Sequence, residues 1–144
     1  MTQLSWDAVS VGDTLQPQSF PISVYRLVVA AGANRDFNAI HHNTAFAQAT
    51  GAPEMYANTL FLQGMWERTV RRYIGLGGTI RRLASFRMNS FNCVGETVVV
   101  KGEVVRKWRE GPDGLLEIRV WSENGDRVSV GPGAMVVSLP VDPQ

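Results

Sequence analysis

One short segment combines the acidic, amide and imidazole side chains that acid–base chemistry needs. Residues 34–42 have the sequence NRDFNAIHH, in which Asp36 and His41 are five positions apart. On a regular helix this spacing turns the two side chains about 140° away from each other. We expect Asn38 to form an Asx-type turn between them, so that the carboxylate and the imidazole converge. Such a pair can hold a water molecule and take its proton near neutral pH.

A structural interpretation of the same residues is also open. Asp36 could be a turn or cap residue, and His41 a packed or surface histidine. Spacing alone does not decide between the two interpretations. His42 is adjacent to His41 and should face another direction, so we expect it to be structural.

The elements around this segment are expected to be helical. Ser23 can cap a helix over residues 24–33, which Gly32 and Asn34 are expected to end. A second, small helix is expected near residues 44–50, capped by Asn43 or Thr44 and closed by Gly51. The longest helical pattern covers residues 58–74. Its apolar stripe consists of Phe61, Leu62, Met65, Trp66, Thr69, Val70, Tyr73 and Ile74.

The second half of the chain is typical of β-structure. Strands are expected over residues 79–91, 96–108, 115–122 and 127–139, separated by turn signals at 92–95, 111–114 and Asn124-Gly125. A long helix followed by four antiparallel strands predicts an α+β fold in which the sheet wraps around the helix, the layout of the hot-dog architecture. Long strands leave an edge to be covered, and pairing in a dimer is one solution.

Composition excludes several classes of function. The 144 residues fit a single domain, residues 1–144, and a net charge of +1 argues against a nucleic-acid binder. One cysteine and two histidines leave no disulfide framework and little material for a metal site. Cys93 has no histidine nearby in the sequence, so a nucleophilic role is not expected. We expect no metal and no cofactor.

The chain also lacks targeting signals of the common kinds. Its first residues show no secretory pattern, and its apolar runs are far shorter than the ~20 residues that span a bilayer. We therefore expect a cytoplasmic protein that does not enter a membrane.

Residues 36–41, DFNAIH, resemble the hydratase motif of the MaoC-like, (R)-specific enoyl-CoA hydratase family. That motif is Asp-x-Asn-Pro-aliphatic-His, and Asp36, Asn38, Ile40 and His41 match it. The resemblance implies a hot-dog fold in which Asp36 and His41 activate one water for addition to a trans-2-enoyl thioester. The reverse reaction is dehydration of a 3-hydroxyacyl thioester. Asn38 would support the loop.

This chain departs from the motif in two places. Ala39 replaces the proline, which removes no chemical group. The family's His-Gly at the start of the central helix is replaced by Asn58-Thr59. The helix N-terminus still offers free N–H groups to the thioester oxygen, and the Asn58 amide could add another.

With these departures, the chain is similar to small MaoC-like subunits of steroid side-chain enoyl-CoA hydratases. The resemblance implies a bulky acyl-CoA substrate and either a homodimer or a heteromer with a second MaoC-like subunit. Tyr56, just before the central helix, could line an acyl pocket or belong to the core.

Other signals are weaker. Five arginines, Arg68, Arg71, Arg72, Arg81 and Arg82, could meet the phosphates of coenzyme A or form a solvated surface. The glycine-rich segments 75–78 and 131–133 lack the context of a nucleotide loop and are expected to be turns or bulges. Two rival functions remain open: a hot-dog thioesterase and a non-catalytic acyl-binding partner subunit.

Overall fold

The described part of the chain contains one long helix, several short helices and five strands. The computed structural model describes residues 3–142. In chain order the elements are β1 (Gln18–Pro21), α1 (Val24–Ala33), the 3-10 helix η1 (Ala39–His41), α2 (Thr44–Ala49), α3 (Thr59–Ile74), β2 (Thr79–Ala84), β3 (Thr97–Glu110), β4 (Asp113–Asn124) and β5 (Arg127–Leu139).

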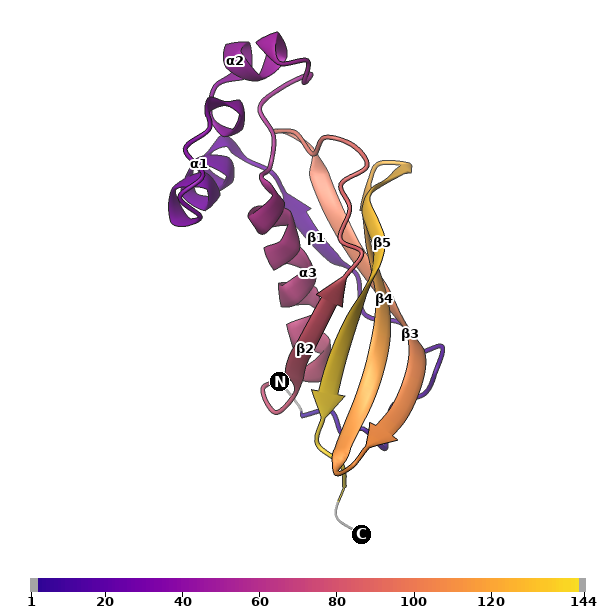
Figure 1. Cartoon of the computed structure of the whole chain (residues 1–144). Helices are drawn as coiled ribbons and strands as arrows, with labels where there is room; N and C mark the ends of the chain where they lie inside the picture. Colours follow the sequence, from indigo (N-terminus) through magenta and orange to yellow (C-terminus); the bar gives the residue numbers. More distant parts are fainter. Residues whose placement is uncertain (1–2, 143–144) are drawn as a thin grey trace.

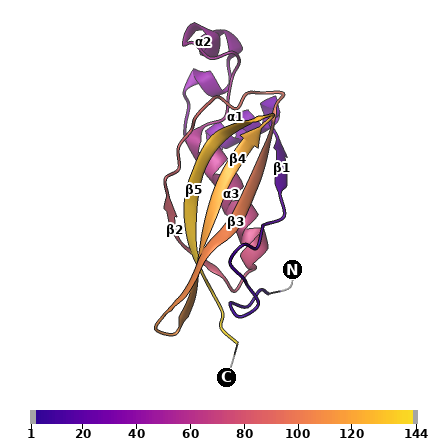
Figure 2. The same ribbon diagram turned by 90° about the vertical axis from the view of Figure 1, so that its right-hand side faces the viewer.

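The strands form one antiparallel sheet in the order β1-β3-β4-β5-β2. Helix α3 lies along one face of this curved sheet, and α1 and α2 lie together beyond its N-terminal end (Figure 1). Strands β1 and β2 occupy the two edges of the sheet (Figure 2). The arrangement confirms the predicted α+β hot-dog fold.

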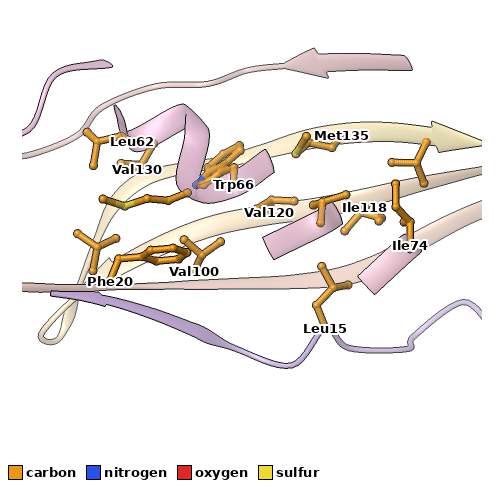
Figure 3. Packing of buried hydrophobic residues seen from close by; sticks show 14 of the residues in the cluster. Leu15, Phe20, Leu62, Trp66, Ile74, Val100, Ile118, Val120, Val130 and Met135 are labelled. Atoms are coloured by element: carbon orange, nitrogen blue, oxygen red, sulfur yellow. The ribbon is translucent and has the colours of Figure 1, made fainter. Parts of the chain in front are cut away.

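The core lies between α3 and the sheet (Figure 3). The helix buries the apolar stripe predicted for it, with Phe61 and Tyr73 only half-buried at its margins. Trp66 is fully buried, and its indole Nε1 donates a hydrogen bond of 2.8 Å to Ser122 Oγ on β4. This bond satisfies the one polar atom of a large side chain, which buried tryptophan generally requires.

The predicted helix starts are confirmed in detail. Ser23 Oγ accepts a hydrogen bond from Arg26 N at the start of α1, and Asn43 Oδ1 accepts one from Phe46 N at the start of α2. Each cap satisfies a backbone N–H group that has no partner within its helix.

The prediction of one continuous strand over residues 79–91 is wrong beyond Ala84. Strand β2 pairs with β5 up to Ala84 opposite Ala134, where β5 continues into Gly133 and Pro132. Pro132 has no N–H group to donate, and a side chain at Gly133 would meet the carbonyl oxygens of Ala84 and Ser85. Residues after Ala84 therefore leave the regular ladder, and Ser85 has a φ of 58°.

Both hairpin turns differ from the predicted ones, the first by being shorter and the second by a shift of one residue. The β3–β4 turn occupies only residues 111–112, because Asp113 and Gly114 already pair with β3. The β4–β5 turn consists of Gly125 and Asp126, while Asn124 is the last residue of β4. This shift by one residue places the Asn124 side chain in the interior, where it is buried.

Candidate active site

The end of α1 places Asp36 by a Schellman motif. Arg35 N donates to Gly32 O and Asp36 N donates to Ala31 O, with Arg35 in the left-handed region at φ 54°. Asn34 is the C-cap, as expected, whereas Gly32 lies inside the helix. The position that glycine usually occupies in this motif is thus held by Arg35, and the backbone turns sharply just before the carboxylate.

The expected Asx-type turn follows at Asn38. Asn38 Oδ1 accepts a hydrogen bond of 3.2 Å from Ile40 N, and the turn begins η1. His41 is the last residue of η1. The exposed Asn38 side chain therefore shapes the loop that carries His41.

This loop brings the two predicted catalytic side chains together. His41 Nε2 lies 3.0 Å from Asp36 Oδ2, and the His41 side chain is 6% exposed against 38% for Asp36. His41 Nδ1 lies 2.8 Å from the carbonyl oxygen of Tyr56. A carbonyl oxygen can only accept, so Nδ1 carries a proton, and Nε2 is the ring nitrogen that can exchange a proton with Asp36.

Tyr56 contributes to the site through its backbone and its ring. Its carbonyl accepts from His41, its N–H donates to Ile40 O, and its ring meets the His41 ring edge-on at 5.5 Å. Burial raises the pKa of the Tyr56 phenol, with smaller contributions from the charges of Cys93 and Asp36. The backbone role was not predicted, because any residue type can supply a carbonyl.

The segment that carries the Tyr56 carbonyl is anchored to the loop before β3. Ala57 N donates to Asn92 O and Val94 N donates to Met55 O. Glu96 Oε2 in turn accepts hydrogen bonds of 2.7 Å from Cys93 N and of 2.7 Å from Asn124 Nδ2. Residue types at positions 92–96 carried no signal for this network, because it depends on contacts distant in sequence.

Glu96 is the charged centre of this network. Burial alone raises the pKa of its carboxyl, but the hydrogen bonds from Cys93 and Asn124 and the guanidinium of Arg127 together hold it below its ordinary value of 4.5. The carboxylate is therefore ionised at neutral pH, the form that accepts all three donors.

Asn58, the N-cap residue, and Thr59 begin α3, directly after the segment that carries the Tyr56 carbonyl. Asn58 Oδ1 accepts from Phe61 N at 2.8 Å and from Asn34 Nδ2 at 3.4 Å, which links the ends of α1 and α3. Asn58 is 5% exposed, and its Nδ2 is a buried donor without a partner among the described residues. The N–H groups of Thr59 and Leu60 precede the intrahelical bonds of α3 and can serve an anionic oxygen.

Two cavities border the region, and neither includes Asp36 or His41. One, of about 340 Å³, is lined by residues that include Tyr56, Leu62, Met88 and Phe91. The other lies between α1 and α3 and is lined in part by Asn34.

The predicted basic residues do not form one cluster of free charges. Arg71 donates to Gly78 O, Arg72 donates to Gln18 Oε1, and Arg81 pairs with Asp113 at 3.4 Å. A cavity of about 490 Å³ beside Arg81 and Arg82 is also lined by Arg106 and by three carboxylates, Glu110, Asp113 and Glu117. Its charges balance, so it is not an evident anion site.

Among residues 3–142, no helix is long and apolar enough to cross a bilayer. Within the same residues, no three histidine, cysteine or acidic side chains are grouped so that they could hold a metal ion.

Comparison with known proteins identifies the family. No family model matches the chain. It is 30% identical over 105 residues to the 3-oxo-4,17-pregnadiene-20-carboxyl-CoA hydratase beta subunit of Mycobacterium tuberculosis, covering 72% of this chain and 78% of that protein. The fold matches a chain of the ChsH1-ChsH2 complex of the same organism with a TM-score of 0.80 and 26% identity, covering 92% and 98% of the two chains. It also matches an R-hydratase of Pseudomonas aeruginosa with a TM-score of 0.82 and 18% identity, covering 97% and 88%. The protein belongs to the MaoC-like hydratase family of hot-dog enzymes.

Proposed function

We propose that the protein adds water to the double bond of a trans-2-enoyl-CoA, with Asp36 and His41 as the groups that activate the water. The observation that carries this proposal is the 3.0 Å separation of His41 Nε2 and Asp36 Oδ2 beside the N-terminus of α3. One water molecule can hydrogen-bond to both atoms, and the more exposed carboxylate is open to solvent.

The proposed reaction begins with proton transfer from this water. The basic nitrogen of His41 or the Asp36 carboxylate takes a proton while the water oxygen forms a bond to the β-carbon. The electron pair of the double bond moves onto the thioester carbonyl oxygen, giving an enolate. A proton returned to the α-carbon completes the 3-hydroxyacyl thioester, so that one water is consumed and no redox partner is needed.

The start of α3 supplies the stabilisation that the enolate oxygen needs. The backbone N–H groups of Thr59 and Leu60 and the unpartnered Asn58 Nδ2 are the proposed donors. Asn58 thereby takes over part of the role of the family's His-Gly. Asn38 and Tyr56 act indirectly in this proposal, by holding His41.

The proposed substrate is a bulky acyl-CoA, and the proposed partner is a second hot-dog subunit. Both follow from the relatives: one is named as the hydratase of a pregnadiene-carboxyl-CoA, and another is part of a complex of two different subunits. A cytoplasmic location likewise stays a prediction.

The first test is hydration of a series of enoyl-CoAs by wild type, Asp36→Asn and His41→Ala, alone and with a co-purified partner subunit. Each substitution should lower turnover at least ~100-fold, the low end of general acid–base catalysis. His42→Ala is the matched control, since His42 is an exposed histidine one position away.

The same assay separates the rival functions. Release of free coenzyme A would indicate a thioesterase, whereas loss of the enoyl absorbance without thiol release indicates a hydratase. Wild-type activity in both dyad variants would contradict the mechanism. Binding of acyl-CoA without turnover, with and without the partner, would indicate a non-catalytic subunit.

A further inference from the structure

Two buried asparagines, Asn92 and Asn124, take no direct part in the proposed reaction. Asn92 lies in the loop between β2 and β3 and is 1% exposed, and Asn124 is the last residue of β4 and is 7% exposed. An amide buried to this degree costs stability unless hydrogen bonds replace its contacts with water. The partners of the two amides therefore indicate what these side chains hold in place.

Asn124 ties the loop to the end of the sheet. Its Nδ2 donates hydrogen bonds of 3.2 Å to Asn92 Oδ1 and of 2.7 Å to Glu96 Oε2. Since an amide NH₂ group has two hydrogens, both are used in holding the loop. Asn92 Nδ2 in turn donates to the carbonyl oxygen of Ser90 at 3.4 Å. The end of β4 thus fixes the loop at two separate points.

The fixed loop forms a β-bridge with the segment before α3. Tyr56 lies opposite Cys93 in an isolated antiparallel bridge. One hydrogen bond, of 2.9 Å, runs from Ala57 N to Asn92 O, and another, of 3.0 Å, joins the residues on the other side of the pair. Because these bonds use the groups of the flanking residues, the N–H and C=O of Tyr56 itself point to the opposite edge of the segment.

His41 lies at that opposite edge. Tyr56 N donates to Ile40 O at 3.3 Å, and Tyr56 O accepts from His41 Nδ1 at 2.8 Å. The other ring nitrogen, Nε2, is 3.0 Å from Asp36 Oδ2. A tilt of the segment would therefore carry the acceptor of His41 with it and change the distance between the imidazole and the carboxylate.

Asn89, in the same loop, makes hydrogen bonds of similar length that lead elsewhere. Its Nδ2 donates to Gly131 O at 2.7 Å and to Val128 O at 3.3 Å, both on β5. Neither acceptor belongs to the bridge around Tyr56. Both asparagines therefore tie the loop to the sheet, but of the two only Asn124 bonds to a residue of the bridge.

We propose that Asn124 is a positioning residue of the hydration reaction, which holds the Tyr56 carbonyl, through Asn92 and the bridge, where His41 Nδ1 meets it. The inference rests on the proposed hydratase function and adds to it a residue from the β4–β5 hairpin. Because Asn124 acts through other residues, its loss should slow turnover and leave substrate binding largely unchanged.

The first test compares Asn124→Ala and Asn124→Leu with the matched control Asn89→Ala. Both Asn124 variants remove the amide, and leucine keeps most of the side-chain volume, so an effect common to both belongs to the hydrogen bonds. The substrate is the enoyl-CoA that wild type hydrates fastest, with the partner subunit present if wild type needs it. We expect both Asn124 variants to lower kcat at least tenfold with KM within twofold of wild type. Asn89→Ala should leave both constants within twofold.

The second test observes the His41 ring directly. The chain has two histidines, so spectra of protein labelled with ¹⁵N-histidine contain the rings of His41 and His42, which His42→Ala assigns. The Nδ1 proton of His41 should exchange with water at least tenfold faster in Asn124→Ala than in wild type, because its acceptor is no longer held. The exchange rate in Asn89→Ala should stay within twofold of that in wild type.

Three results would overturn the inference: wild-type kcat in both Asn124 variants, a lower kcat with unchanged exchange at His41 Nδ1, or an equal loss of kcat in Asn89→Ala. Should neither Asn124 variant fold, exchange in wild type decides. In urea below the unfolding transition, the Ala57 and Cys93 N–H groups and the His41 Nδ1 proton should become exchangeable together. Earlier exchange of the His41 proton would overturn the inference. Wild type that hydrates no enoyl-CoA would contradict the proposed function, whereas the exchange measurements would still test the link between Asn124 and His41.

Discussion

His41 is oriented so that only one of its ring nitrogens can act as a base. The Tyr56 carbonyl fixes the proton on Nδ1, which leaves Nε2 facing Asp36. The carbonyl belongs to a segment held by the loop at residues 92–94, and Glu96 holds that loop. A carboxylate outside the proposed chemistry thus helps to set the direction of the His41 imidazole.

Replacing Glu96 tests this chain of contacts. Glu96→Gln should lower the free energy of unfolding by roughly 1–2 kcal/mol at neutral pH, because donors that now meet an anion would meet a neutral amide. The folded-state pKa lies below 4.5, so the carboxylate's contribution is fully present above that value and is lost as the pH falls through the lower folded-state pKa. The stability difference between wild type and variant, measured by urea unfolding, should therefore shrink in acid. If the difference in unfolding free energy between wild type and Glu96→Gln stays constant with pH, the Glu96 charge does not contribute to stability.

At the scale of elements, α3 both anchors the core and begins at the site. Its N-cap residue serves both purposes: Asn58 Oδ1 caps the helix, while Nδ2 is left without a partner. A buried amide donor normally costs stability unless it is hydrogen-bonded. The proposed enolate oxygen gives this donor a partner only during catalysis.

Two substitutions at Asn58 separate capping from catalysis. Asn58→Ser keeps a capping oxygen and removes Nδ2, whereas Asn58→Ala removes both. We expect Asn58→Ala to cost about 1 kcal/mol of stability and Asn58→Ser clearly less. Both should lower kcat at least tenfold, since both lack the donor to the enolate oxygen. A kcat for Asn58→Ser equal to that of wild type would mean that Nδ2 has no part in the reaction.

The elements also show where sequence reasoning succeeds. Helices α1, α2 and α3 are set by local caps and apolar spacing, so their ends were predicted to within a residue. The end of β2 at Ala84 was not predicted, because it depends on Gly133 and Pro132, which lie in a strand almost fifty residues away. The convergence of Asp36 and His41 was also predicted, from residue types in one turn. The Tyr56 carbonyl and the Glu96 network were not, since they arise only when distant segments meet.

At the scale of the whole molecule, α1, α2 and the start of α3 lie together at one end (Figure 1). Many of the exposed apolar residues belong to this part of the chain. They are Val24, Tyr25, Val28, Val29, Phe37, Phe46 and Leu60. Phe37, next to Asp36, is 74% exposed. A concentration of this kind generally marks a binding site or an interface. Tyr25, Val29 and Leu60 line the cavity between α1 and α3, but Phe37 and Phe46 do not.

We expect the surface around Phe37 and Phe46 to contact a second hot-dog unit. Purified alone or with its partner subunit, the chain should show by light scattering a mass of at least twice the 15.9 kDa of one chain. Phe37→Glu should shift this mass toward that of a single chain, because a charge would have to be desolvated at the interface. Val11→Glu is the control, since Val11 is a comparably exposed apolar residue in the segment before β1. A single-chain mass for wild type in both preparations, or an unchanged assembly in Phe37→Glu, would contradict the prediction. Because Phe37 neighbours Asp36, loss of assembly should also lower turnover, and restoring the complex at high protein concentration should recover it.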